Sequence, residues 1–482
     1  MQEKNIVRDE VVGRVFQNTF WLFNSSVLGR ALNLLKGIIL ARLLFPEDFG
    51  LFGLASIIIG FTIIFSDVGA GMFLIYKHGD DKDKHNDTAF WINFFIATFL
   101  ALIVVGAAPF IVKFYKQPLL LSILNVLALS LWFQIICNVH RSLLRKELKL
   151  QKIAVIDGVI SIVSFLIAVL LAFRNYGVWA LVLSTLVSNI INAFLIFFAS
   201  GWFPKFKFLS ASFKEIAPFS VWYLGSAIVW YIVFNIDNLI ISKFLNMKEL
   251  GLYTIAYNYA LLPITLIANS FGNVVFPELA RLDRNSQHFW ETFYKLSRFI
   301  AFSVCPVACF LVIGAPDFFP IIFGAKWNGA IIPFQILAVY AMIRCFWIDP
   351  FGALGNFKSS FLVGLMTCIL STGGILFGLK YGIIGVAVAV LTIVGSSHII
   401  ALYISTNSFG KLLKGLQNAA PYLLTSVGAA FIAIIIRHLL ISSIGGLKWL
   451  LFFVSTTTVF GIYMFVFRRN LKDIFVVIKN KT

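Results

Sequence analysis

One face of the first apolar stretch carries the polar residues that could bind an anion. Its members are separated by seven, four, three and four residues, a spacing that stacks them on one side of a helix. They are Thr19, Ser26, Arg30, Asn33 and Gly37. A guanidinium near the middle of a bilayer costs about 2.5 to 3.5 kcal/mol, so Arg30 must face protein or water, as a ligand-binding group or a structural ion pair. Lys36 lies about 120° around the same helix, where it could bind ligand or snorkel to the headgroups.

Two carboxylates and two further cations are the other charged candidates for a site within the membrane. Asp67 lies about two helical turns from the inner end of the second stretch, beside glycines that could bend or unwind a helix. Asp237 lies in the outer half of the seventh stretch, between two asparagines. Arg344 and Lys358 fall near inner ends, where they could line an inward-facing mouth or only mark the basic cytoplasmic border.

The remaining polar residues of the apolar stretches have packing interpretations that compete with functional ones. Asp157 could pair with the basic loop Arg141–Lys152 that precedes it. Tyr223 and Trp230 share a helix face, and their spacing favours helix packing over a sugar-stacking platform. A satisfied hydrogen bond is a simpler role for His398 than a proton relay. The five cysteines show neither disulfide nor metal-site spacing.

The sequence contains no recognisable catalytic arrangement. The carboxylates are scattered over separate stretches, and we find no Ser/His/Asp set, no phosphate-cradling glycine loop and no zinc-protease motif. We therefore expect a protein that is not an enzyme and has no cofactor. Any energy it uses would come from a proton or sodium gradient, from the membrane potential or from the gradient of its substrate.

The elements that must position these residues are membrane-spanning helices. Of the 482 residues, 60% are hydrophobic and 12% are charged, a balance that no soluble domain with a solvated surface can accommodate. Apolar runs of roughly 20 residues, the length that spans a bilayer, occur in fourteen places. They cover residues 15–40, 49–76, 89–112, 118–140, 153–173, 177–200, 214–245, 249–276, 292–315, 328–349, 357–378, 382–404, 417–439 and 447–468.

Basic residues indicate which side of the membrane faces the cytoplasm. A cytoplasmic N-terminus assigns the larger share of the 39 Lys and Arg residues to inner loops and helix ends. The loop Arg141–Lys152 and the tail Arg468–Lys481 carry five each. The net charge of +18 is thus mostly surface charge facing anionic membrane lipids, and nucleic acid is not an expected partner. No small-residue cleavage site follows the first helix, so we expect that helix to be retained.

A phrase of fourteen residues occurs twice and predicts an internal repeat. Arg42–Ala55 (RLLFPEDFGLFGLA) returns 201 residues later as Lys243–Ala256 (KFLNMKELGLYTIA), with four identical positions. Tyr176-Gly177 returns as Tyr381-Gly382 at an offset of 205. Two landmarks with nearly the same offset indicate a repeat of about two hundred residues.

We expect an all-α integral membrane protein of about fourteen transmembrane helices, with two parallel six-helix lobes and a terminal helix pair. Because six is an even number, both copies of the phrase fall on outer turns, as in lobes related by an axis along the membrane normal. The expected parts are a cytoplasmic N-terminus (1–14), an N-lobe (15–200), a C-lobe (214–404), helices thirteen and fourteen (417–468) and a basic cytoplasmic tail (469–482). All outer connections are short, the longest spanning residues 316–327, which leaves little room for an outer active site.

Three segments resemble the bacterial polysaccharide transporter family of Wzx-type oligosaccharide flippases. RLLFPEDFGLFGLA follows a helix with a mid-membrane arginine, IDNLIISKFLNMKELGLYTIAYNYALLP begins at Ile236, and FPELARL opens the next inner loop. The similarity covers essentially the whole chain. It is greatest for the capsule and teichuronic-acid exporter branch of the multidrug/oligosaccharidyl-lipid/polysaccharide superfamily. Met247 stands where the first copy of the phrase has Pro46, a mild departure.

The resemblance implies transport of an undecaprenyl-pyrophosphate-linked oligosaccharide, a repeat unit of surface polysaccharide or lipopolysaccharide, across the bacterial cytoplasmic membrane. Two lobes with alternating access would enclose a hydrated, cationic cavity while the prenyl tail stays in lipid. The cations that would attract the diphosphate are Arg30, Lys36, Arg344 and Lys358, with Asn33 on the same face as Arg30. Asp67 and Asp237 would balance charge, contact sugar hydroxyls or couple to a proton or sodium ion.

Three other functions compete with this one. A drug/cation antiporter of the same superfamily would need a carboxylate-centred site, and a lipid II flippase shares the helix count. A membrane-embedded transferase or polymerase is disfavoured by the short outer loops. The partners expected for the flippase are its lipid-linked substrate, anionic lipids and polysaccharide polymerase or export machinery.

Overall fold

The computed structural model describes most of the chain as helices. The described residues are 2–66, 84–147, 149–206, 221–266, 286–344, 351, 354, 356–406, 409–444 and 448–467, and within them all regular structure is helical. The chain divides into two compact units, Met1–Leu224 (unit 1) and Gly225–Thr482 (unit 2).

Many of these helices are long and apolar enough to cross a membrane. Eight helical segments of the described residues meet that criterion, and α9 with α10 forms a ninth that is bent by 45°. Large apolar side chains point outward along them, among them Phe110, Phe198 and Leu424, each more than two thirds exposed. The expected all-α membrane fold is therefore confirmed, because such surfaces suit lipid and not water. Each of the fourteen predicted stretches overlaps a helix of the structure.

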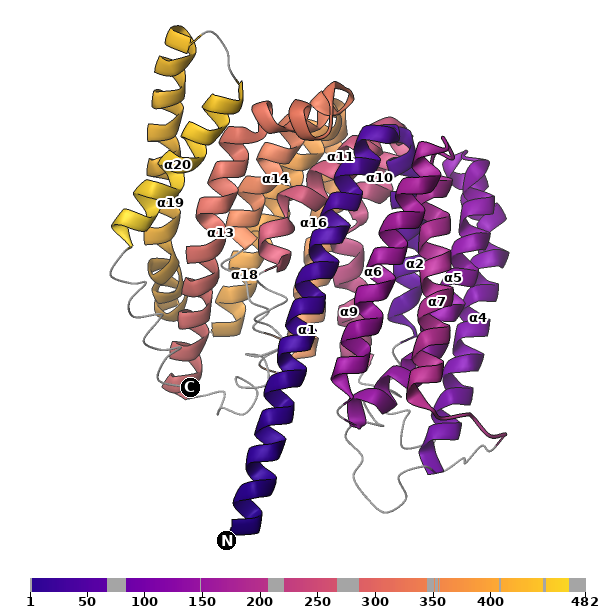
Figure 1. Ribbon diagram of the computed structural model, residues 1–482. Coiled ribbons are helices and arrows are strands. Elements are labelled where there is room, and N and C mark those ends of the chain that lie inside the picture. The colour runs from indigo at the N-terminus through magenta and orange to yellow at the C-terminus, as the bar shows by residue number, and fades with distance from the viewer. Residues whose placement is uncertain are drawn as a thin grey trace. The chain divides into compact units, whose positions relative to one another are not determined.

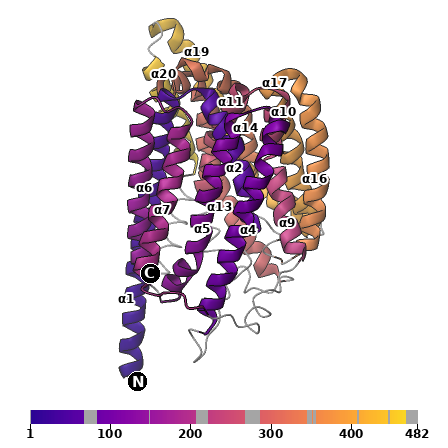
Figure 2. The same ribbon diagram turned by 90° about the vertical axis from the view of Figure 1, so that its right-hand side faces the viewer.

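Unit 1 is organised around α5. Its described helices are α1 (Gln2–Leu43), α2 (Pro46–Ile64), α4 (Lys84–Tyr115), α5 (Leu119–Lys146), α6 (Leu150–Phe173) and α7 (Trp179–Ser200). α5 contacts α2, α4, α6 and α7, while α1 packs along α6. Both views show α6 and α7 side by side (Figure 1, Figure 2). α1 begins before the predicted start of the first span, so the polar residues that precede this span are helical too.

Unit 2 contains more helices and several interruptions. Its elements are α9 (Val221–Val233, whose first four residues fall in unit 1), α10 (Ile236–Phe244), α11 (Met247–Ala260), α13 (Gln287–Ile322), η1 (Ala325–Ala330), α14 (Ile331–Arg344), α16 (Phe357–Gly378), η2 (Leu379–Tyr381), α17 (Gly382–Ala389), η3 (Val390–Val394), α18 (Gly395–Thr406), α19 (Phe409–Ile444) and α20 (Lys448–Val466). α13 contacts α14, α19 and α20, and Figure 1 shows α13, α19 and α20 as neighbours. α16 and α17 pack against each other, so residues 357–406 fold back at the short η2 turn.

The repeated phrase forms the same helix–turn–helix corner in both units. In unit 1, α1 ends at Leu43 and α2 begins at Pro46. In unit 2, α10 ends at Phe244 and α11 begins at Met247. The second landmark agrees, because Gly177 (φ 54°) and Gly382 (φ 65°) both have the left-handed backbone that glycine adopts readily. Both glycines stand at or just before the start of a helix.

α13 is longer than its sequence predicts. The connection expected at residues 316–327 is helical as far as Ile322, and a single 3-10 turn, η1, follows. Pro316 and Pro320 lie inside α13. Proline is tolerated within membrane helices because neighbouring groups can satisfy the freed carbonyls. This connection is therefore even shorter than expected.

Candidate functional site

Lys36 of α1 lies at the contact between α1 and α6. The Lys36 ammonium is partly buried and donates a hydrogen bond to the Ser164 hydroxyl over 3.0 Å. Nearby, α1 approaches α6 so closely that a Cβ on Gly29 would lie 3.0 Å from the Ser161 hydroxyl. Small residues at a helix contact permit such close packing in membranes. Lys36 is thus held by a side chain of α6 in the described structure.

Arg30 and Asn33 are the members of the predicted polar face with nitrogen donors. Arg30 is partly buried, and Asn33 is exposed. Arg30 lies one helical turn from Asn33 and about a turn and a half from Lys36. The structure therefore keeps the three residues on one short segment of α1, with a guanidinium, a carboxamide and an ammonium that can all donate to phosphate oxygens.

Asp157 has the structural role that its position in the sequence suggests. The Arg141 guanidinium donates to both carboxylate oxygens of Asp157, over 2.8 and 3.1 Å, and to the Asn192 carbonyl oxygen over 3.1 Å. This two-pronged geometry is the strongest form of an arginine–carboxylate pair. The pair ties α5 to α6 and α7, so the predicted pairing of Asp157 with the basic loop is confirmed.

In unit 2, Asp237 lies just after the break between α9 and α10. Its side chain is 2% exposed, and one carboxylate oxygen accepts a hydrogen bond from the Tyr253 hydroxyl over 2.8 Å. The other oxygen accepts from the backbone N–H of Asn238 over 2.8 Å and from its side-chain amide over 3.1 Å. Asn238 in turn accepts from the Thr254 hydroxyl over 3.3 Å. Asp237 therefore fastens α10 to α11.

Arg344 reaches the same break from α14. Its guanidinium carbon lies 4.6 Å from the centre of the Phe234 ring, a cation–π contact, and the Tyr257 hydroxyl accepts a hydrogen bond from it. The sequence predicts different depths for Asp237 and Arg344, the outer half and an inner end. The structure places Arg344 against Phe234, three residues before Asp237 in the chain, at the break between α9 and α10.

Aromatic and polar side chains continue this cluster on the α9 side of the break. The Tyr340 hydroxyl and the His398 Nε2 atom are 3.2 Å apart, which confirms the hydrogen bond predicted for His398. The Trp230 ring stacks on His398 at 6.2 Å, and its N–H donates to the Ser360 hydroxyl over 3.1 Å. Trp230 therefore packs between helices, in agreement with the simpler prediction. His398 follows the π-helical segment η3, an irregularity that is frequent near functional positions.

We call this group the break cluster. Its members come from five separate helices, α9, α10, α11, α14 and α18, and from the break between α9 and α10. They are Trp230, Phe234, Asp237, Tyr253, Tyr257, Tyr340, Arg344 and His398. The three tyrosines were not singled out in the sequence, where their only signal is a hydroxyl within an apolar stretch.

The two remaining predicted residues are Lys358, which belongs neither to the break cluster nor to the α1 segment, and Asp67. Lys358 is exposed in the first turn of α16, where the Asn356 side chain caps the helix by accepting from the Ser359 N–H over 3.2 Å. Asp67 lies outside the described residues. Among the residues that the structure does describe, no three His, Cys, Asp or Glu side chains gather as metal ligands.

Comparison with known proteins gives a consistent result. The sequence profile of the family described as "Polysaccharide biosynthesis protein" matches residues 39–332. The succinoglycan biosynthesis transport protein ExoT of Rhizobium meliloti is 24% identical over 436 residues, which cover 88% of this chain and 86% of that protein. The lipopolysaccharide biosynthesis protein WzxC of Escherichia coli is 25% identical over 342 residues, 69% of this chain and 68% of that protein.

A solved structure shows the same fold. The lipid II flippase MurJ, in an inward closed conformation, superimposes with a TM-score of 0.71 at 18% identity. The superposition covers 95% of this chain and all of that one.

Proposed function

Because the chain belongs to the polysaccharide biosynthesis protein family, we propose that it carries an undecaprenyl-pyrophosphate-linked oligosaccharide across the cytoplasmic membrane. The family match over residues 39–332 is the observation that carries this proposal, and it confirms the resemblance found in the sequence. ExoT and WzxC are named for transport and for lipopolysaccharide biosynthesis, which supports the assignment to a repeat-unit flippase. The oligosaccharide is thus the substrate of a transporter and undergoes no chemical change.

The α1 segment supplies the chemistry that such a substrate requires. A diphosphate cannot enter hydrocarbon without partners, because burying an unpaired anion costs many kcal/mol. Arg30 and Lys36 would bind the diphosphate oxygens, and the exposed Asn33 would donate to phosphate or to a sugar hydroxyl. Arginine suits this role because its planar donors match phosphate in pairs. In this mechanism the prenyl tail stays in lipid while the two units alternate access to the two leaflets.

The proposed orientation has both termini in the cytoplasm. The distribution of basic residues supports it, because cytoplasmic ends of spanning helices carry the excess of lysine and arginine. The loop Arg141–Lys152 and the tail Arg468–Lys481 would then lie on the anionic inner surface of the membrane.

A drug/cation antiporter is the less favoured function for this fold. Such a protein needs a carboxylate that can meet a cationic ligand. Asp237 is instead 2% exposed and occupied by hydrogen bonds from Tyr253 and Asn238. A lipid II flippase would differ from the proposed function only in the substrate that it moves. A transport assay with both substrates distinguishes the two.

The test is transport in proteoliposomes. Purified protein is reconstituted with a lipid-pyrophosphate-linked oligosaccharide, and accessibility of the glycan on the far leaflet is measured with and without pH or sodium gradients. We expect Arg30→Ala to slow transport about tenfold to a hundredfold, because hydrogen bonds to charged groups contribute about 1.5 to 3 kcal/mol. Arg174→Ala is the control, since Arg174 is an exposed residue at the end of α6.

Each outcome separates the alternatives. Unchanged transport in Arg30→Ala would remove the α1 site from the proposal. Movement of lipid II in preference to the oligosaccharide would assign the chain to the other flippase activity. Efflux of organic cations without movement of either lipid would favour the antiporter.

A further inference from the structure

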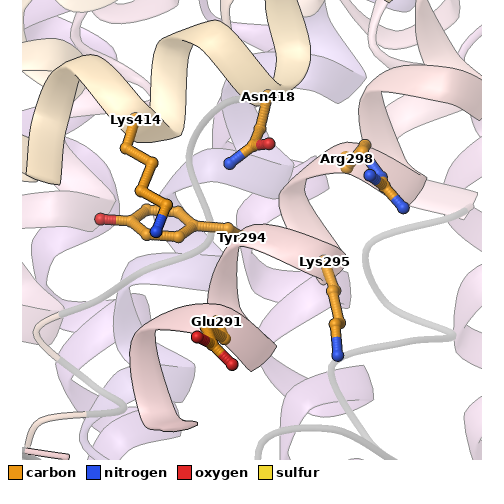
Figure 3. A pocket seen from close by; sticks show the side chains of 6 residues that line it. All are labelled: Glu291, Tyr294, Lys295, Arg298, Lys414 and Asn418. Atoms are coloured by element: carbon orange, nitrogen blue, oxygen red, sulfur yellow. The ribbon is translucent and has the colours of Figure 1, made fainter. Parts of the chain in front are cut away.

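A small cavity lies between the first turns of α13 and α19 in unit 2. Its volume is about 190 Å³, and Figure 3 shows the side chains from the two helices that line it. They are Glu291, Tyr294, Lys295, Arg298, Lys414 and Asn418. We call this cavity the α13–α19 pocket. None of its residues belongs to the break cluster or to the α1 segment.

The α13–α19 pocket has an excess of positive charge. Three cationic side chains, Lys295, Arg298 and Lys414, and a single carboxylate, Glu291, line the pocket, so the lining carries a net charge of +2. Glu291 accepts a hydrogen bond from Gln287, over 2.8 Å, and no described acidic residue forms an ion pair with any of the three cations. Because like charges repel, such a group is stable where an anion can neutralise it.

The wall of the pocket is preformed. Tyr294 is 5% exposed and packs in a cluster with Trp290, Leu402 and Leu412. α19 passes close to it, since a Cβ on Gly415 would lie 3.1 Å from the Tyr294 ring. The aromatic wall therefore needs no reordering when a ligand binds, whereas the three cations beside it are exposed and reach the ligand from the surface.

The position of the pocket points to a ligand that is part anion and part hydrocarbon. The membrane spans Phe289–Ile322 and Leu412–Ile436 begin at its level. Along α19, apolar side chains are exposed beside the pocket, at Leu413, and beyond it, at Leu424 and Phe431. The cavity is also smaller than the roughly 300 to 1,000 Å³ of sites for drug-sized molecules, so it suits a headgroup and not an oligosaccharide.

We propose that the α13–α19 pocket binds the phosphate group of a membrane lipid. Lys295, Arg298 and Lys414 donate to the phosphate oxygens, the Asn418 amide provides a neutral donor, and the hydrocarbon chain lies along the exposed side of α19. Basic pockets between transmembrane helices on the cytoplasmic side are suited to anionic headgroups. The phosphate can belong to an anionic phospholipid of the bilayer or to the polyprenyl diphosphate of the transported lipid. Only the second source rests on the proposed function.

The test measures lipid binding by the purified, full-length protein in detergent. Native mass spectrometry gives the affinity for phosphatidylglycerol, for undecaprenyl diphosphate and for zwitterionic phosphatidylcholine. The pocket variant is Lys295→Gln with Lys414→Gln. The matched control is Lys248→Gln with Lys380→Gln, which removes two exposed lysines from elsewhere in unit 2. Size-exclusion profiles of all variants check that they fold.

We expect the pocket variant to bind anionic lipid about fivefold more weakly for each cation removed, and the control to bind like the wild type. A loss of affinity for phosphatidylglycerol alone assigns the pocket to a bilayer lipid. A loss for undecaprenyl diphosphate alone assigns it to the transported lipid, and losses for both support the shared phosphate chemistry. Equal affinities of the wild type and a folded pocket variant for both anionic lipids would overturn the proposal. Transport is measured separately, so a protein that moves no oligosaccharide could still pass this binding test.

Discussion

The two units of the chain fill their interiors with different side chains. Among the described residues, the largest fully buried side chains of unit 2 are aromatic, such as Trp327, Tyr340 and Phe334. Those of unit 1 are leucines, Leu40 and Leu54. Aromatic side chains bury more area and, in the case of tyrosine and tryptophan, bring a polar group that needs a partner. The interior of unit 2 therefore combines dense packing with buried hydrogen bonds.

Asp237 in unit 2 is more deeply buried than the charged residues of the α1 segment and of the Arg141 pair in unit 1. In unit 1, Arg30 and Lys36 are only partly buried, and Asp157 of the Arg141 pair is 41% exposed. In unit 2, Asp237 is buried and held by two helices. We infer that the α1 segment of unit 1 is placed to meet a ligand, and that the break cluster holds a bent helix in position. Three predictions test this difference.

Replacement of Asp237 with alanine gives the largest expected loss of stability. It removes the acceptor for the Tyr253 hydroxyl and for Asn238, and leaves their donors unpaired in a buried site. Each unpaired buried donor costs about 1 to 3 kcal/mol, so the free energy of unfolding should fall by about 2 to 5 kcal/mol. Thermal unfolding of the detergent-solubilised protein measures the change.

Asp157→Ala is the matched control for this prediction. In this variant Arg141 loses its carboxylate partner, but the Asp157 side chain is 41% exposed and the pair is therefore screened. Exposed ion pairs contribute about 0 to 1 kcal/mol, and the two-pronged geometry places this pair near the upper value, so the free energy of unfolding should fall less than in Asp237→Ala. Equal decreases in the free energy of unfolding for the two alanine variants would show that the units do not differ in how strongly these two carboxylates stabilise them.

Arg344→Met should have an intermediate effect. The change removes the cation–π contact with Phe234 and the hydrogen bond to Tyr257, worth about 1 to 2 kcal/mol together. Lys36→Met in unit 1 removes a single hydrogen bond to Ser164 and should cost about 0.5 to 1 kcal/mol. Thermal unfolding of both variants, compared side by side, sharpens the contrast between the units. A larger decrease in the free energy of unfolding for Lys36→Met than for Arg344→Met would contradict the proposed difference between the units.

The helices and their corners could be predicted from the sequence because their signals are local. Hydropathy over about 20 residues depends on nothing outside each stretch, and each copy of the repeated phrase contains the whole turn between its two helices. The pairing of Asp157 with Arg141 was also within reach, because both residues flank one short loop.

The break cluster could not be predicted in the same way. The break falls at Phe234 and Asn235, where the sequence has no proline or glycine that would predict a bend. Arg344 meets Phe234 across more than a hundred residues of sequence, so their contact depends on how the helices pack. The α13–α19 pocket has the same origin, since Arg298 alone fits the basic cytoplasmic border and only the packing of α19 adds Lys414.

The repeated corners offer the smallest and most local test of the comparison. In unit 2 the Asn246 side chain caps α11 by accepting from the Glu249 N–H over 2.9 Å. In unit 1 the equivalent residue is Phe45, which cannot accept a hydrogen bond and is 65% exposed, and the Asp48 carboxylate instead accepts from its backbone N–H over 3.0 Å. Both residues have extended backbones, with ψ of 158° and 170°, so an asparagine fits either corner.

We therefore expect Phe45→Asn to raise the free energy of unfolding by about 0.5 to 1 kcal/mol, and Asn246→Ala to lower it by about 1 kcal/mol. The first change adds a cap and loses little buried area, while the second removes a cap and leaves the Glu249 N–H without its acceptor. Thermal unfolding of the two variants and of the double variant measures both effects, which should add because the corners belong to different units. If Phe45→Asn instead lowers the free energy of unfolding, the hydrogen bond from the Phe45 N–H to the Asp48 carboxylate already caps the first corner. The two copies of the repeat would then cap the same turn with different hydrogen bonds that cannot be combined.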